Sequence, residues 1–223
     1  MSSLLFYTDE NEVTVVTDTL VVTPDEDFLG HANKAVAIER LKLIVAGTGV
    51  AELFIQWIAF VNEQSVALDV DSLNEYATQR LQFIWREVQR DIPTLADQTA
   101  TIYLFGLSNN SGHIHGYAYR SASNFTSSRI PNGLAMKPPL DAEELAGVEY
   151  WNFPAMSKEI MRRQAALEYA KPMGLRVLIG GDANAIKLTS GGFNFTPLGA
   201  LNIPMPEDQA RSVKPGPTEN DDF

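Results

Sequence analysis

Two amphipathic helices in direct succession, after a block of short strands, are the feature that most limits the folds open to this chain. One apolar stripe recurs at helical spacing from Val50 to Val61, and a second covers Leu73 to Val88 and ends before Pro93. The capping-box spacing of Ser72 and Glu75 marks the start of the second helix. Each helix must bury its apolar face, so a helical layer packed on a sheet is predicted.

The segments around these helices predict an α+β domain over residues 1–203, followed by an acidic, proline-containing tail or arm over 204–223. The strands are short and rich in β-branched residues. A third helix is expected at about 157–170, after an irregular stretch from 121 to 156. The expected strands are residues 3–7, 13–16 continued at 20–22, 34–38, 41–45, 101–107, 113–119, 176–179, 183–188 and 193–196.

Composition narrows the functional classes. The chain has no cysteine among its 223 residues, which excludes disulfides, thiolate zinc sites and a cysteine nucleophile and suits a reducing compartment. Its 17 basic and 28 acidic side chains give a formal charge of −11, which disfavours nucleic-acid binding. No apolar run reaches about 18 residues, and the first ten residues lack the basic segment of a secretory signal. A cytoplasmic protein that does not enter the membrane is therefore expected.

The N-terminal segment places three reactive side chains at even spacing. Methionine before a small residue is ordinarily removed, which would make Ser2 the first residue of the mature chain. Asp18 follows sixteen residues after Ser2, and Lys34 sixteen residues after Asp18. A free α-amine has a pKa near 8, so it can accept a hydroxyl proton at neutral pH without a histidine. Gly47 and Gly49 stand where a strand leads into the first amphipathic helix.

This arrangement resembles the β-subunits of proteasomes and the related bacterial ring peptidases, which are N-terminal-nucleophile hydrolases. The resemblance is specific over the first 50 residues and extends more loosely over 2–197. It implies a four-layer α-β-β-α sandwich in which Ser2 is the nucleophile and Asp18 and Lys34 are its catalytic partners, with Gly47 or Gly49 receiving the oxyanion. It further implies a peptidase or amidase acting on peptide substrates in a homo-oligomeric ring. A partner ATPase is a candidate, and no cofactor or metal is expected.

Departures from the family pattern support a second hypothesis. Leu20 stands where the family has an arginine, and residues 130–133 lack the Gly-Ser-Gly turn whose serine supports the terminal amine. Arg176 and Ile179 occupy the places of a further Asp and Ser before Gly180. The alternative is a catalytically inactive relative that acts as a structural or assembly protein, with a viral origin left open.

Other polar motifs have simpler interpretations. His113 and His115 alternate on an expected strand without further metal ligands, so an exposed hairpin is the preferred interpretation. The turn at residues 47–49 could cradle a phosphate, but it lacks the spacing of a dinucleotide site and the lysine of a P-loop. Ser2 and Lys34 are each unremarkable when taken alone, and only their joint spacing with Asp18 indicates a site.

Overall fold

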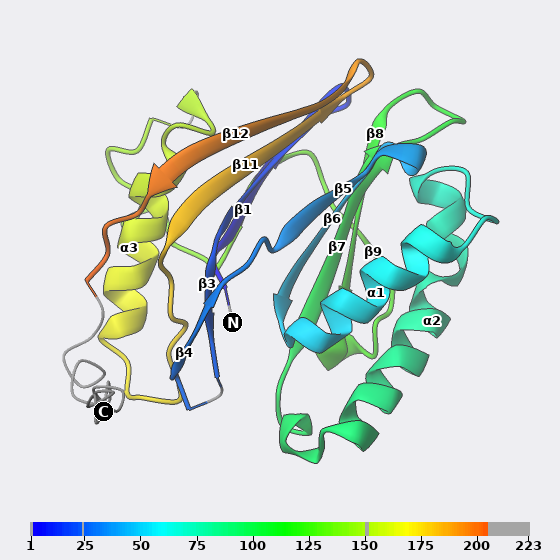
Figure 1. Cartoon of the computed structure of the whole chain (residues 1–223). Helices are drawn as coiled ribbons and strands as arrows, with labels where there is room; N and C mark the ends of the chain where they lie inside the picture. Colours follow the sequence, from blue (N-terminus) through cyan, green and yellow to red (C-terminus); the bar gives the residue numbers. More distant parts are fainter. Residues whose placement is uncertain (1, 24, 150–151, 205–223) are drawn as a thin grey trace, which may run out of the picture.

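The computed structural model describes residues 2–23, 25–149 and 152–204 and has a mixed α/β fold with antiparallel sheets (Figure 1). Met1 and most of the expected tail, residues 205–223, lie outside these ranges. The described elements, in chain order, are β1 (Leu4–Thr8), β2 (Glu12–Asp18), β3 (Leu20–Val22), β4 (Phe28–His31), β5 (Ala35–Ile38), β6 (Leu43–Gly49), α1 (Ala51–Glu63), α2 (Val70–Asp91), β7 (Ala100–Leu107), β8 (Ile114–Arg120), β9 (Ser128–Arg129), β10 (Gly133–Lys137), α3 (Ser157–Tyr169), β11 (Asp182–Thr189) and β12 (Gly192–Ala200).

Two five-stranded antiparallel sheets form the centre of the molecule. The first has the strand order β10-β1-β2-β11-β12, the second has the order β5-β6-β7-β8-β9, and β3 and β4 form a separate ribbon. In Figure 1 the two sheets face each other. Helices α1 and α2 cover the outer face of the second sheet, and α3 covers the outer face of the first. None of the described helices is long and apolar enough to span a membrane.

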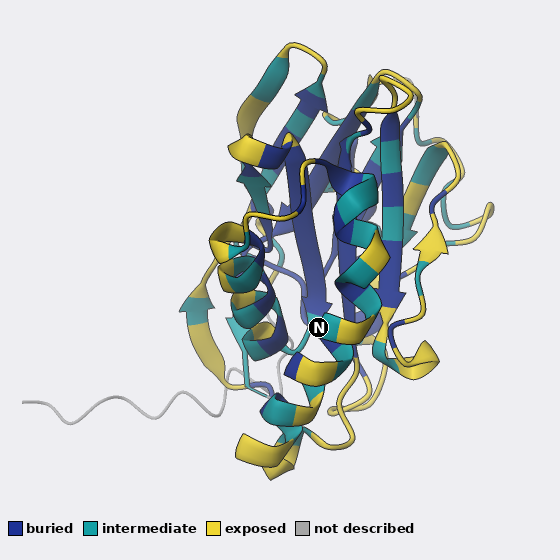
Figure 2. Cartoon of the chain, turned by 90° about the vertical axis from the view of Figure 1, so that its right-hand side faces the viewer, coloured by how far each residue is buried: buried dark blue, intermediate teal, exposed yellow. Residues whose placement is uncertain are grey.

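Strand alternation divides the apolar residues among three cores. On β1, Leu4 faces the opposite sheet whereas Leu5 faces α3. On β6, Ile44 faces the opposite sheet whereas Val45 belongs to the same core as Trp57 of α1. Both faces of these central strands are therefore buried, as Figure 2 shows by their dark colour. This double burial explains why the sequence has unbroken apolar runs there instead of an alternating pattern.

The structure also corrects parts of the expected element order. Residues 176–179 were expected to form a strand, but they run as an irregular segment into β11. Strand β4 lies in an expected loop, and β9 and β10 lie in the stretch expected to be irregular. Strand β10 pairs with β1 along its whole length, with Lys137 opposite Leu4. It thereby brings residues more than a hundred positions away in sequence next to the N-terminus.

The capping box of α2 lies three residues before the expected one. Asp69, not Ser72, is the N-cap: its Oδ1 accepts hydrogen bonds from the Ser72 N–H at 2.8 Å and the Ser72 hydroxyl at 2.7 Å. The Ser72 Oγ in turn accepts from the Asp69 N–H at 3.0 Å. Asp69 Oδ2 accepts from the Asn109 N–H at 2.8 Å, which ties the start of α2 to the β7–β8 turn. Glu75 is exposed and takes no part in this cap.

Replacing Asp69 with alanine should lower the free energy of unfolding at neutral pH by about 1–2 kcal/mol, because it removes an N-cap. Burial raises the pKa of Asp69, but the hydrogen bonds from Ser72 and Asn109 outweigh it and hold the pKa below its ordinary value. A carboxyl whose folded pKa is depressed stabilises the fold above its unfolded pKa, about 3.9, and loses that contribution as the pH falls through the folded pKa. The loss in free energy of unfolding caused by Asp69→Ala should therefore be smaller at acidic pH than at neutral pH.

Urea denaturation at neutral and acidic pH measures both effects. Glu75→Ala is the matched control, and we expect its change to stay within about 0.5 kcal/mol, as for other exposed positions. An equal loss in the two variants would show that Asp69 does not cap α2.

Candidate functional site

The first residues of the described chain are held against the end of β2. The Ser3 N–H donates to Asp18 Oδ1 at 2.9 Å, and the Asp18 N–H donates to the Ser3 carbonyl at 3.4 Å. The Ser3 hydroxyl donates to Gln164 Oε1 at 2.6 Å, which attaches the same segment to α3. Ser2 is consequently fixed beside Asp18 and is only 8 % exposed.

Asp18 and Lys34 form a buried ion pair. Lys34 Nζ lies 2.8 Å from Asp18 Oδ1, a contact consistent with the roles that the family resemblance implies, and the Asp18 side chain is fully buried. The Gly180 N–H donates to Asp18 Oδ2 at 3.2 Å, so both carboxylate oxygens have partners. Asp18 ends β2 of the first sheet, and Lys34 immediately precedes β5 of the second. The ion pair therefore bridges the two sheets at one end of the space between them.

Burial shifts the titration of both members of this pair. It raises the pKa of Asp18, against the opposing effect of the Lys34 charge and the hydrogen bonds from Lys34, Gly180 and Ser3. It lowers the pKa of Lys34, against the opposing effect of Asp18. Removing either charge from water is unfavourable, and each partner offsets only part of that penalty. A lysine with a lowered pKa gives up its proton more readily than an ordinary surface lysine.

A cavity of about 450 Å³ opens beside Ser2 and Lys34. Its lining includes all of β3 and residues 47–52. The lining is mostly apolar, and its apolar side chains come from β3, β4, β5 and α1 and from Val50 and Leu95. The apolar side chains that line it are Leu20, Val21, Val22, Leu29, Val36, Val50, Phe54, Ile55, Ile58 and Leu95. The reactive groups therefore face a space that can hold an apolar side chain of a ligand.

The two candidate oxyanion glycines lie in the last residues of β6. The Gly47 N–H donates to the Lys34 carbonyl at 3.0 Å, so this group already has a partner. Because alternate residues of a strand direct their N–H groups to the same edge, Gly49 faces that edge beyond the start of β5. Gly49 has a φ of +95°, and a Cβ there would lie 2.0 Å from the Thr99 carbonyl oxygen. Of the two, Gly49 is the better placed to donate to a ligand.

Lys137, which lies near the same end of the sheets, was not predicted from the sequence. Its Nζ donates to the hydroxyls of Thr48 and Thr101, each at 3.1 Å, and Thr48 lines the cavity. Burial, aided by the charge of Arg120, lowers the pKa of Lys137. In the sequence Lys137 is a lysine at the end of a segment without evident periodicity, and nothing else indicates that it lies near the site. Its position depends on the β1–β10 pairing, which local sequence does not specify.

Two residues at which this chain departs from the family pattern, Arg176 and Leu20, take part in structural contacts. Arg176 forms a buried ion pair with Glu26, with an Nη2–Oε2 distance of 2.6 Å. The Leu20 N–H donates to the Gly180 carbonyl at 3.1 Å, so the β3 ribbon is joined to the segment that supports Asp18. In the part of the chain that the structure describes, no group of three or more His, Asp or Glu side chains is placed to hold a metal ion.

The sequence matches no protein-family model and no curated protein. Its fold, however, is similar to solved structures of Anbu, the ancestral beta-subunit. The protein from Yersinia bercovieri superposes with a TM-score of 0.60 at 12% identity, covering 89% of this chain and 87% of that one. A Gly-1 mutant of Anbu from Hyphomicrobium sp. strain MC1 gives 0.58 at 10% identity, covering 90% and 89%. The chain therefore has a fold similar to that of Anbu.

Proposed function

We propose that this chain is a proteasome-related N-terminal-serine hydrolase that cleaves peptide or amide bonds, built as a four-layer α-β-β-α sandwich. The observation that carries the proposal is the placement of Ser2 beside the buried Asp18–Lys34 pair and on the wall of an apolar cavity. The similarity to Anbu supports the fold but not the chemistry, since the two chains share only 12% identity.

In the proposed reaction the free α-amine of Ser2 takes the proton of the Ser2 hydroxyl, and the hydroxyl oxygen attacks the substrate carbonyl. The Lys34 ammonium, held by Asp18, stabilises the developing negative charge, and the Gly49 N–H is the candidate oxyanion donor. The protonated amine then supplies the proton to the leaving nitrogen, and water releases the acyl group by the reverse proton transfers. The apolar cavity favours substrates with an apolar side chain next to the scissile bond.

An inactive relative with a structural or assembly role is the second candidate. The occupied Gly47 N–H and the use of Arg176 in an ion pair with Glu26 favour it. For either function we propose a homo-oligomer, with a ring as the specific form, because the similar structures are of a protein described as a subunit. A partner ATPase is proposed from the sequence resemblance, and a cytoplasmic location is proposed from the composition.

Intact mass spectrometry of the purified chain tests the requirement that separates the two functions. The hydrolase proposal expects a mature chain that has lost Met1, because only then does Ser2 carry a free α-amine. Complete retention of Met1 would contradict catalysis by Ser2 and favour the inactive relative. Light scattering on the same preparation tests the assembly, for which we expect a mass several times that of the 24.6 kDa chain. A monomer would contradict the oligomer without bearing on the chemistry.

A further inference from the structure

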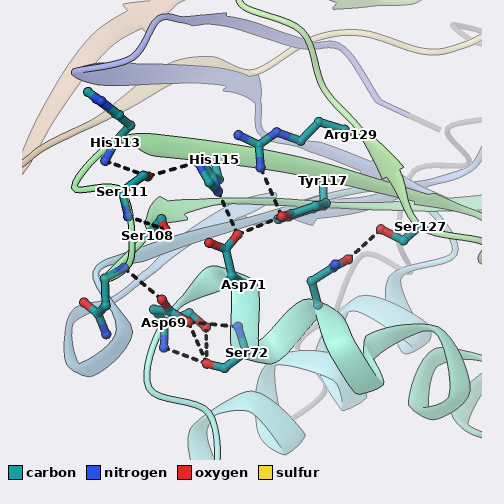
Figure 3. A network of polar contacts seen from close by, with 12 residues as sticks. Asp69, Asp71, Ser72, Ser108, Ser111, His113, His115, Tyr117, Ser127 and Arg129 are labelled. Carbon is teal, nitrogen blue, oxygen red and sulfur yellow. Dashed lines mark hydrogen bonds and ion pairs between the residues drawn. The ribbon is translucent and has the colours of Figure 1, made fainter.

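A second group of side chains with catalytic geometry lies where the β7–β8 turn meets the start of α2 (Figure 3). Ser111 Oγ lies 3.1 Å from His115 Nε2, and His115 Nδ1 lies 2.8 Å from Asp71 Oδ1. Both distances fall within the range for a serine nucleophile, its histidine base and an orienting carboxylate. Ser111, His115 and Asp71 are not among the residues that line the cavity beside Ser2.

The surrounding hydrogen bonds favour an ionised Asp71 and set the tautomer of His115. Burial raises the pKa of Asp71, but hydrogen bonds from Ser108, His115 and Tyr117 outweigh it and hold the pKa below its ordinary value. The Tyr117 hydroxyl donates to the same Oδ1 at 2.7 Å. An ionised carboxylate can only accept hydrogen bonds, so His115 Nδ1 must carry the proton that it shares with Asp71. In the neutral imidazole Nε2 then has a free lone pair directed at Ser111.

The hydrogen bonds of Ser111 direct its hydroxyl proton toward His115. The His113 N–H donates to Ser111 Oγ at 3.2 Å, so the hydroxyl oxygen accepts on that side. Its proton is left to donate to His115 Nε2, the direction required for general-base catalysis. Residues 109–113 are exposed, whereas the side chains of His115 and Asp71 are only 19% and 23% exposed. The nucleophile is thus open to solutes while its supporting pair is partly shielded.

We propose that Ser111 is an activated nucleophile, with His115 as its general base and Asp71 as a positioning residue, that hydrolyses small carboxylic esters with good leaving groups. The substrate class is limited because the backbone N–H groups of residues 111–113 already have acceptors and are not free to stabilise an oxyanion. The N–H groups of Ser111, Gly112 and His113 donate to Ser108 Oγ, the Ser108 carbonyl and Ser111 Oγ, respectively. Esters of phenols need less oxyanion stabilisation than amides, because a phenolate leaves readily.

In this reaction the Ser111 oxygen bonds to the ester carbonyl carbon as its proton passes to His115 Nε2. The carbon–oxygen bond to the phenol then breaks, and the phenolate takes the proton from Nε2. Water attacks the acyl-serine and passes a proton to Nε2, which returns it to Ser111 as the carboxylic acid is released. The net reaction consumes one ester and one water and needs no further reactant.

A fluorophosphonate probe tests the nucleophile directly, since it forms a stable phosphorus–oxygen bond with an activated serine and releases fluoride. The full chain carrying Ser2→Ala is labelled, and the modified peptide is mapped by mass spectrometry. We expect the adduct on Ser111. His115→Gln can still donate a hydrogen bond to Asp71 but cannot act as a base, and it should slow labelling by roughly 100-fold. Ser190→Ala, an exposed serine in the β11–β12 turn, is the matched control and should not change the rate.

Hydrolysis of p-nitrophenyl acetate by the Ser2→Ala protein gives a second readout. Adding Ser111→Ala should reduce the rate of hydrolysis to that in buffer alone. An unlabelled Ser111 in folded Ser2→Ala protein would overturn the proposal, as would an unchanged labelling rate in folded His115→Gln. Circular dichroism establishes folding for each variant. In the unsubstituted chain, an adduct on Ser2 alone would support the proposed peptidase and overturn this second site. An adduct on Ser111 alone would support this second site and count against Ser2 as an activated nucleophile.

Discussion

Replacing Lys34 with methionine is expected to lower the free energy of unfolding by about 3–5 kcal/mol, the largest loss of stability predicted for a single substitution in this chain. Methionine fills a similar volume but leaves the Asp18 carboxylate without its cationic partner in a fully buried position. The hydrogen bonds from Ser3 and Gly180 remain, yet two backbone N–H groups do not neutralise a buried charge. Asp18 should respond with a further increase in its pKa and take up a proton on folding.

Urea denaturation of the purified variants measures this loss, and an exposed ion pair of the same type provides the control. Lys187 Nζ lies 2.6 Å from Glu12 Oε2, with side chains 41% and 34% exposed. Lys187→Met should therefore change the free energy of unfolding by less than about 1 kcal/mol. Adding Asp18→Asn to Lys34→Met should restore part of the lost stability, because the stranded charge is removed. Equal effects of Lys34→Met and Lys187→Met would rule out a buried pair.

The family resemblance implies that Asp18 and Lys34 act together, and the structure shows the contact between them. Two hairpin strands carry the chain from Ser2 to Asp18, and the β3–β4 ribbon returns it to Lys34. Local strand and turn preferences act over such short connections. The resemblance could therefore indicate this contact, whereas the catalytic roles of these residues remain predictions.

The contacts that sequence reasoning missed join segments far apart in the chain. Lys137 reaches the site only because β10 adds to the edge of β1, and the five residues of β10 show no clear alternation of burial. His115 was interpreted as part of an exposed hairpin, since its partner Asp71 lies 44 residues earlier in the chain. Such pairings are set by packing of the whole sheet and helix layer rather than by local propensity.

The prediction that Ser72 caps α2 was wrong for a different reason. Ser72 and Glu75 match the spacing of a capping box, but so do Asp69 and Ser72, because serine can occupy either position of the motif. The cap at Asp69 has one contact beyond the motif, because the Asn109 N–H adds a third hydrogen bond to the Asp69 side chain. A local motif can thus be present twice, and its spacing alone does not indicate which copy forms.

Replacing Ser2 with alanine should abolish the proposed hydrolysis while leaving the fold intact. Loss of a serine nucleophile lowers kcat by at least roughly four orders of magnitude in comparable enzymes. The free energy of unfolding should change by less than about 1 kcal/mol, because only one hydroxyl is removed. Fluorogenic peptides with an apolar residue before the scissile bond measure activity, and urea denaturation measures stability.

Ser3→Ala is the matched control, since it removes the neighbouring hydroxyl and leaves the proposed nucleophile in place. It deletes the bond from Ser3 Oγ to Gln164, so it should lower stability by about 1 kcal/mol while activity is retained. The two serines would then separate chemistry from structure at adjacent positions. If Ser2→Ala hydrolysed peptides as fast as the unsubstituted chain, Ser2 would not be the nucleophile. The buried Asp18–Lys34 pair would then be a structural bridge between the sheets, as the inactive-relative hypothesis requires.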